Sequence, residues 1–163
     1  MVNDRLLREQ LLSLLRSENA HMSFDEAVAD FPMDQINTRI PNGSYTPWHI
    51  LEHLRLTQRD ILVFMTDPNY KEPSWPGDYW PAKDARATPT EWDQTITGFR
   101  ADLAELERLV QDERFDLEQA VPWGSGQTHL REFLVVADHN AYHVGEFGVL
   151  RQVMQTWPAD HTE

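Results

Sequence analysis

The sequence predicts an all-α fold, a four-helix bundle with long crossover loops. Four long segments carry apolar residues at spacings of three and four, the period of a helix that buries one face. No run alternates apolar and polar residues as a half-buried strand does, and no glycine-rich nucleotide loop is present. With 163 residues, 40% of them hydrophobic, we expect residues 1–163 to form a single bundle domain.

The first two helices are short and amphipathic. Residues 2–17 carry leucines at helical spacing, namely Leu7, Leu11, Leu14 and Leu15. Ser23 with Glu26 three residues later is a capping-box pattern, which predicts a second, short helix that stops before Pro32. Residues 32–45 are predicted to form a loop because they contain prolines and an Asn-Gly pair.

A third helix is predicted from Thr46, as N-cap, and Pro47, at the first helical position, to Asp67. It carries His53 in its second turn and Asp60 seven residues later, on nearly the same face. The connection 68–89 is rich in proline and aromatic residues, among them Trp80. Two interpretations stay open: a segment that closes over a pocket, or one whose aromatic side chains pin it to the bundle.

The fourth and fifth helices complete the bundle. A Thr-x-x-Asp cap at Thr90 predicts a helix that continues to about Glu113. After a connection at 115–127, the last helix is expected from Thr128 to about Met154. Because it is apolar on much of its circumference, we expect it to be mostly buried.

Composition excludes several classes of function. The formal charge is −13, with 14 basic against 27 acidic residues, which argues against binding to nucleic acid. No stretch approaches the roughly 18 uninterrupted apolar residues of a membrane span, and the N-terminus lacks the pattern of a signal peptide. The chain has no cysteine, so disulfides and thiolate metal sites are impossible, and we expect a cytoplasmic protein without membrane partners.

Two pairs of histidines at i, i+4 are the clearest chemical signal. His139 and His143 lie in the last helix, and His49 and His53 lie in the third. This spacing puts both imidazoles of a pair on one helix face, where they can bind one metal ion. Each pair alone is equally compatible with buried, hydrogen-bonded histidines, but a bundle that brings the two helices together favours a shared site.

His139 and His143 are the firmer pair, and a third ligand has to be chosen between His49 and His53. His53 neighbours apolar residues on the expected inward side, which favours it, whereas His49 in the first turn is expected at a pocket rim or exposed. The remaining histidines, His21, His129 and His161, need no special role.

At this point the sequence resembles the DinB-like superfamily of four-helix-bundle proteins, and the resemblance covers nearly the whole chain. It rests on Thr-Pro-Trp-His-Ile-Leu-Glu-His-Leu-Arg at 46–55, Asp-Tyr-Trp-Pro at 78–81 and Asp-His-Asn-Ala-Tyr-His-Val-Gly-Glu-Phe at 138–147. In that family one histidine of the second main helix and a His-x-x-x-His pair of the last bind a metal. The matching positions here are His53, His139 and His143.

The resemblance also implies a divalent ion, typically zinc or nickel, and often a homodimer. Relatives include thiol S-transferases that use bacillithiol, a mycothiol-dependent isomerase and some hydrolases. The family often has Gln where this chain has Glu146, which adds a carboxylate close to the histidines. Any thiol used here has to be a low-molecular-weight thiol from outside, because the chain has no cysteine.

These observations lead to a metal-dependent enzyme that acts on a small-molecule substrate, as a thiol-dependent S-transferase or a hydrolase. Candidate catalytic or ligand-orienting groups are Asp60 and Glu146, with an ordinary surface carboxylate as the alternative for each. Candidates to contact a cofactor are His49, Trp80 and Tyr142. The alternative functions are a non-catalytic metal-binding or stress-associated dimer, and a metal-free bundle that binds a hydrophobic ligand.

Overall fold

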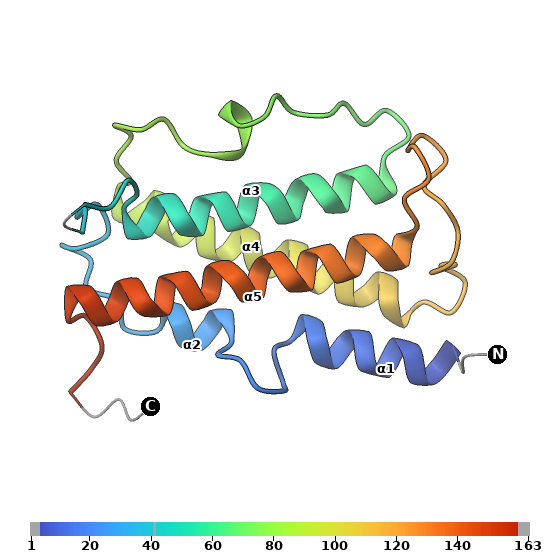
Figure 1. Cartoon of the computed structure of the whole chain (residues 1–163), viewed down its shortest axis with the longest axis horizontal. Coiled ribbons are helices and arrows are strands. Elements are labelled where there is room, and N and C mark those ends of the chain that lie inside the picture. The colour runs from blue at the N-terminus through green and yellow to red at the C-terminus, as the bar shows by residue number, and fades with distance from the viewer. Residues whose placement is uncertain (1–3, 41, 160–163) are drawn as a thin grey trace.

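The structure is a computed structural model that describes residues 4–40 and 42–159 (Figure 1). The described residues form helices and no β-strand, which confirms the predicted all-α class. The elements are α1 (Asp4–Leu15), α2 (Phe24–Val28), α3 (Pro47–Thr66), the 3₁₀ helix η1 (Gly77–Tyr79), α4 (Pro89–Gln111) and α5 (His129–Met154). Within these residues, no helix is both long and apolar enough to cross a membrane.

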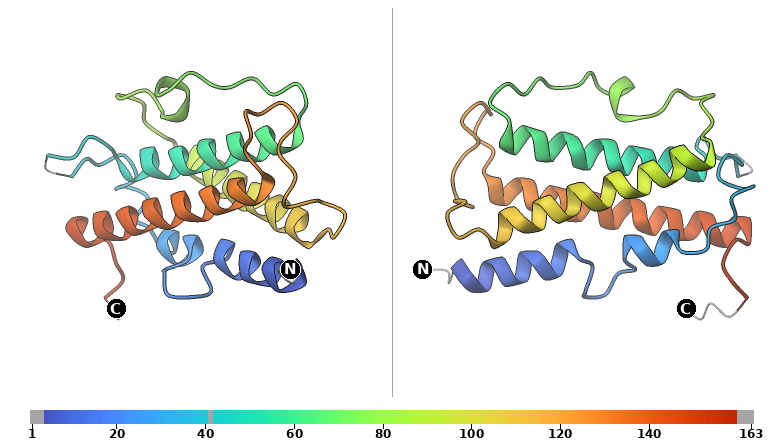
Figure 2. Two further views of the ribbon diagram at one scale, coloured as in Figure 1. Left: turned by 45° about the vertical axis from the view of Figure 1, so that its right-hand side comes forward. Right: turned by 180° about the vertical axis from the view of Figure 1, so that it is seen from behind.

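One long crossover sets the topology. The segment between α3 and α4 returns along the whole length of α3, so that α3 and α4 run in the same direction (Figure 1). α5 runs the opposite way, and α1 and α2 lie end to end as the fourth member of the bundle (Figures 1 and 2). α3 packs against α4 and α5, while α1 packs against α4 and α5 and α2 against α5. α3 and α5 are therefore direct neighbours.

The helix starts follow the expected capping chemistry. Ser23 accepts from the backbone N–H of Glu26, whose carboxylate accepts from the backbone N–H of Ser23, which completes the predicted capping box of α2. Thr46 caps α3 ahead of Pro47, as expected. The N-cap of α5 is Thr128, the residue from which this helix was predicted to run. These caps define where the two long site-bearing helices begin.

The N-cap of α4 was predicted at Thr90, with Asp93 three residues later, and this prediction is wrong. Thr88 is the N-cap, Pro89 takes the first helical position, and Glu91 completes the capping box with Thr88. The physical reason is proline: its fixed φ suits the first turn, and its missing N–H costs nothing at a position where the N–H has no helical partner.

The buried apolar side chains form two clusters, one at each end of the bundle. On α3 one cluster ends at Leu54 and the other begins at Ile61. On α5 the corresponding limits are Val144 and Ala137. Polar side chains fill the section between the clusters or border it: His53, Gln58, His139, Asn140 and His143. The middle of the α3–α5 contact is therefore a polar layer between two apolar cores.

Two buried arginines, Arg151 and Arg8, donate hydrogen bonds to backbone carbonyls at the ends of helices. Arg151 is fully buried, and its guanidinium donates to the carbonyls of Ala27 and Ala29 at the end of α2 and to that of Thr156 after α5. Burial lowers its pKa from the usual value. Arg8 plays the same part at the end of α4, where it donates to the carbonyls of Val110, Asp112 and Phe115.

Replacement of Arg151 by methionine is expected to destabilise the protein by about 3 kcal/mol, because three buried carbonyls lose their donor. Chemical denaturation measures the change. The control is Arg108→Met, which removes an exposed pair with Glu105 on α4 and is expected to leave the stability nearly unchanged, because solvent screens that pair. Equal losses in the two variants would contradict a structural role for Arg151.

Candidate metal centre

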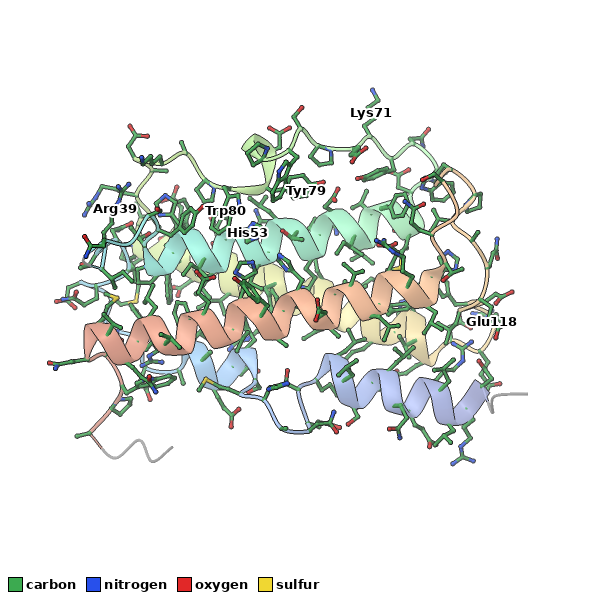
Figure 3. All side chains as sticks on the ribbon, viewed as in Figure 1. Arg39, His53, Lys71, Tyr79, Trp80 and Glu118 are labelled. Carbon is green, nitrogen blue, oxygen red and sulfur yellow. The ribbon has the colours of Figure 1, made fainter. Side chains whose placement is uncertain are left out.

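Three histidines from two helices meet in the polar layer. His53 projects from α3, and His139 and His143 project from α5; one ring nitrogen from each lies within 4.8 Å of the other two. The Nε2 atoms of His53 and His139 are 3.2 Å apart. His53 and His143 are only 3% and 8% exposed, while His139 is partly exposed. The three rings therefore form a compact nitrogen cluster, with His53 below the crossover (Figure 3).

The crossover fixes the orientation of His53. Its Nδ1 lies 2.7 Å from the carbonyl oxygen of Tyr79, which only accepts hydrogen bonds, so Nδ1 carries the proton. Trp80 stacks on the imidazole with ring centroids 3.7 Å apart and planes at 6°. The other face of Trp80 stacks on Tyr45. In the neutral ring, Nε2 is left with a bare lone pair that faces His139.

The carboxylate of Glu146 fixes the orientation of the His143 ring. Glu146 accepts from Nδ1 of His143 over 2.7 Å, from one turn further along α5. The neutral His143 then has its lone pair on Nε2. Tyr142 packs its ring edge-on against His143 but is 70% exposed, so it lies on the outer side of α5.

Two of the three histidines, His53 and His139, are held in the neutral form. Burial lowers the pKa of His53. Burial, followed by the neighbouring His143 and His53, lowers the pKa of His139 to about 3. Both effects disfavour the charged imidazolium, because it would be desolvated and would face like charge. Neutral imidazole is the form that binds metal ions.

This donor set could bind one divalent ion. Two nitrogens on one tetrahedral zinc ion lie about 3.3 Å apart, given bonds of about 2.0–2.1 Å. The Nε2 atoms of His53 and His139 are already 3.2 Å apart. The Nε2 lone pairs of His53 and His143 are oriented by partners outside the cluster, the carbonyl of Tyr79 and the carboxylate of Glu146, as is typical of metal-binding histidines.

His49 is not at a rim or exposed, contrary to the prediction. It is 1% exposed, its Nδ1 contacts the hydroxyl of Thr46, and its Nε2–H donates to the carbonyl of Ala82 over 3.0 Å. His49 and His53 thus both donate to carbonyls of the crossover. The pair at i, i+4 on α3 binds the crossover, and only His53 also reaches α5.

Asp60 lies away from the imidazoles. Its carboxylate accepts from the hydroxyls of Tyr70 and Tyr79, at 2.9 and 2.8 Å. The contact to the histidine cluster is indirect, because the backbone carbonyl of the same Tyr79 orients His53. Aromatic stacking and these hydrogen bonds fasten the crossover to the bundle, which matches the second of the two interpretations left open for it.

Several contacts near the histidine cluster were not predicted from the sequence. Gln58 accepts from the side-chain amide of Asn140, and this bond links α3 to α5 beside the cluster. The sequence carries no signal for it, nor for the role of the Tyr79 carbonyl, since every residue has a carbonyl. His129 is buried and donates to the carbonyl of Asp116; His21 is exposed, and His161 lies outside the described residues.

Comparison with known proteins gives one match. The model of the DinB superfamily matches residues 8–147, a span that includes α3, the crossover, α4 and α5 up to Phe147. It therefore includes the three clustered histidines and Glu146. No curated protein and no solved structure matches the chain.

The contact with Asp60 predicts that the hydroxyl of Tyr79 loses its proton at a higher pH than an ordinary tyrosine. Burial, followed by the hydrogen bond and charge of Asp60, raises the pKa of Tyr79 to about 12 from 10.0. Above pH 10 the unfolded chain loses this proton while the folded chain keeps it, so the stability from this group falls as pH rises from 10 to 12.

An alkaline titration followed by tyrosinate absorbance measures this ionisation. In Asp60→Asn the Tyr79 step is expected at lower pH, because the carboxylate charge is gone while an oxygen acceptor remains. Tyr79→Phe identifies the step by removing it. An unchanged titration in Asp60→Asn would rule out this coupling.

Proposed function

The chain belongs to the DinB superfamily, and from this premise we propose that it is a metal-dependent enzyme in which His53, His139 and His143 bind one zinc or nickel ion. The observation that carries the proposal is the convergence of three imidazoles, two of which, His53 and His143, have their outer nitrogen held by another group. Such orientation from outside favours binding over a chance cluster, because the lone pairs need no rearrangement.

Three histidine ligands favour catalysis over a structural role. Structural zinc sites are usually closed by four protein ligands, whereas catalytic sites keep a position open. When bound, the ion acidifies a water or thiol in that position toward neutral pH. His139 is partly exposed, so the cluster is accessible from one side. Glu146 keeps the proton of His143 on Nδ1 and is a positioning residue.

We propose thiol-dependent S-transfer to a small electrophilic substrate as the reaction, with hydrolysis as the second possibility. The chain has no cysteine, so the nucleophile has to be a low-molecular-weight thiol or water. A thiol cofactor fits a cytoplasmic protein, since thiols there are kept reduced. Trp80, stacked on His53, and Tyr142, exposed beside His143, are the proposed contacts for the cofactor.

A homodimer is proposed on the outer face of α5. This helix is apolar on both sides, and its exposed apolar side chains are Leu134, Tyr142, Val149 and Val153. They share one face with Gly145, where an added Cβ would meet no atom within 4 Å, and with the exposed Asp138. A small residue in the middle of such a face allows close approach of a second copy, and a two-fold axis makes the face self-complementary.

The second candidate is a non-catalytic or stress-associated dimer in which the ion only joins α3 to α5. The same cluster supports it, since His53 and the His139–His143 pair come from those two helices. The two candidates differ in turnover and agree on metal binding. One set of variants therefore separates them.

Alanine variants of His53, His139 and His143 are each expected to lose the one ion per chain that the native protein binds. Elemental analysis measures the stoichiometry. Zinc at 100 times its Kd is expected to stabilise the native protein by about 2.7 kcal/mol and to leave the variants unchanged. His21→Ala, at an exposed position away from the cluster, is the control and should behave as the native protein does.

The same proteins are then tested for loss of free thiol in mixtures of a low-molecular-weight thiol and an electrophile. The enzyme predicts metal-dependent turnover that His143→Ala abolishes while His21→Ala retains it. Metal binding without turnover over a broad electrophile and ester panel favours the non-catalytic dimer. Full metal content in all three variants would refute the proposed ligand set.

Val149→Glu is expected to shift the protein from dimer to monomer, because the two-fold axis would place two carboxylates in one apolar interface. Sedimentation velocity measures the mass. Gln10→Glu, at an exposed position of α1, adds the same charge outside this face of α5 and serves as the control. A native protein that sediments as a monomer would overturn the dimer.

A further inference from the structure

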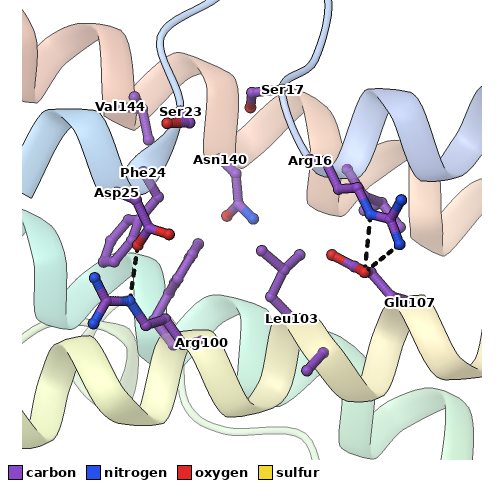
Figure 4. Close-up of a pocket in the computed structure, with 13 residues that line it drawn as sticks. Arg16, Ser17, Ser23, Phe24, Asp25, Arg100, Leu103, Glu107, Asn140 and Val144 are labelled. Atoms are coloured by element: carbon purple, nitrogen blue, oxygen red, sulfur yellow. Dashed lines mark hydrogen bonds and ion pairs between the residues drawn. The ribbon is translucent and has the colours of Figure 1, made fainter.

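A cavity lies where α1 ends and α2 begins. It has a volume of about 370 Å³ and is enclosed by the end of α1, the start of α2, α4 and α5 (Figure 4). Its walls are mainly apolar, with Leu15, Phe24, Phe99, Leu103 and Val144. Neither the three histidines nor the crossover residues that contact them line it.

One polar group faces this cavity without a partner. The side-chain amide of Asn140 projects from α5 into the space (Figure 4). Its Nδ2 donates to Gln58 over 2.8 Å, and Gln58 in turn donates to the carbonyl of Phe99 over 2.8 Å. This chain of donors fixes which end of each amide is oxygen. Oδ1 of Asn140 is buried and has no hydrogen-bond partner among the described residues.

An unpaired acceptor at the wall of an apolar cavity points to a ligand with a donor. Buried polar atoms are almost always hydrogen-bonded, because the desolvated group otherwise loses its bonds to water. Oδ1 accepts only, so its partner must carry an O–H or N–H group. The rest of the wall favours apolar contact.

The charges at the cavity balance. Arg16 at the end of α1 pairs with Glu107 of α4, and Arg100 of α4 pairs with Asp25 of α2, each over 2.8 Å (Figure 4). The two ion pairs tie α4 to both halves of the fourth bundle member. Because each cation has its own anion, the cavity favours neither sign of charge.

We propose that this cavity is a binding site for a small, neutral, mainly apolar molecule that donates one hydroxyl or amide hydrogen to Oδ1 of Asn140. The volume is sufficient, since an engineered apolar cavity of about 150 Å³ in another protein already binds benzene. The three histidines do not line this cavity, although Asn140 directly follows His139 on α5.

Phenol and toluene are the probes, because they match in size and differ in the donor. Titrations of the native protein followed by methyl NMR give both Kd values. Contacts between phenol protons and the methyl groups of Leu103 and Val144 are expected to place it in the cavity. The preference for phenol over toluene is expected to fall by roughly fivefold to tenfold in Asn140→Leu, which removes the acceptor.

Gln58→Leu is the matched control. It breaks the same Asn140–Gln58 bond from the other side but leaves the Asn140 acceptor in the wall, so the preference for phenol should remain. Leu103→Trp should fill the cavity and weaken binding of both probes. Circular dichroism and thermal melts verify that each variant is folded.

Three results would overturn the proposal. They are native protein that binds neither probe, phenol contacts that lie outside the cavity, and a phenol preference that Asn140→Leu leaves intact. If Asn140→Leu does not fold, a crystal structure of the native protein with phenol decides. A phenol hydroxyl within hydrogen-bond distance of Oδ1 supports the proposal, and any other position or an ordered water alone there refutes it.

Discussion

Two hydrogen bonds determine what the middle of this bundle can bind. The carbonyl of Tyr79 and the carboxylate of Glu146 accept from Nδ1 of His53 and of His143, and neither acceptor can donate in return. Each neutral ring is thereby left with its lone pair on Nε2, on the side of the other histidines. Without these acceptors, the rings could rotate or exchange tautomers, and three nearby histidines would be only a polar cluster.

The surrounding fold keeps that arrangement in place. The crossover carries the Tyr79 carbonyl, and it is attached to α3 through His49, through the stack of Trp80 on His53, and through Asp60. On either side along α3 and α5, an apolar cluster packs the two helices together. Rigid packing at both ends holds the polar layer between them, so its groups are positioned before any ligand arrives.

Buried polar side chains in this interior differ in whether each of their nitrogens and oxygens has a partner. All three guanidinium nitrogens of Arg8 and Nδ1 of His129 donate hydrogen bonds, and both side chains bind backbone carbonyls as part of the scaffold. Asn140 is the contrasting case, because its amide nitrogen is paired and its oxygen is not. An unpaired buried oxygen lowers stability unless something fills the position, and this is the physical basis of the second binding site.

Local rules account for what the sequence by itself determined. The i, i+4 spacing puts His139 and His143 on one face of any helix, apolar periodicity yields the all-α class, and cap residues locate the starts of α2 and α3. Pro89 could have located the start of α4 as well. Each of these signals depends on residues within one or two turns of each other.

The tertiary structure decided the rest, because the partners come from distant parts of the chain. His49 and His53 share a helix face, and only the position of α5 separates the one that joins the cluster from the one that binds the crossover. Asp60 has the spacing of a ligand-orienting residue, but the path of the crossover gives it two tyrosine hydroxyls instead. A backbone carbonyl orients His53, and no side-chain pattern can encode a group that every residue has.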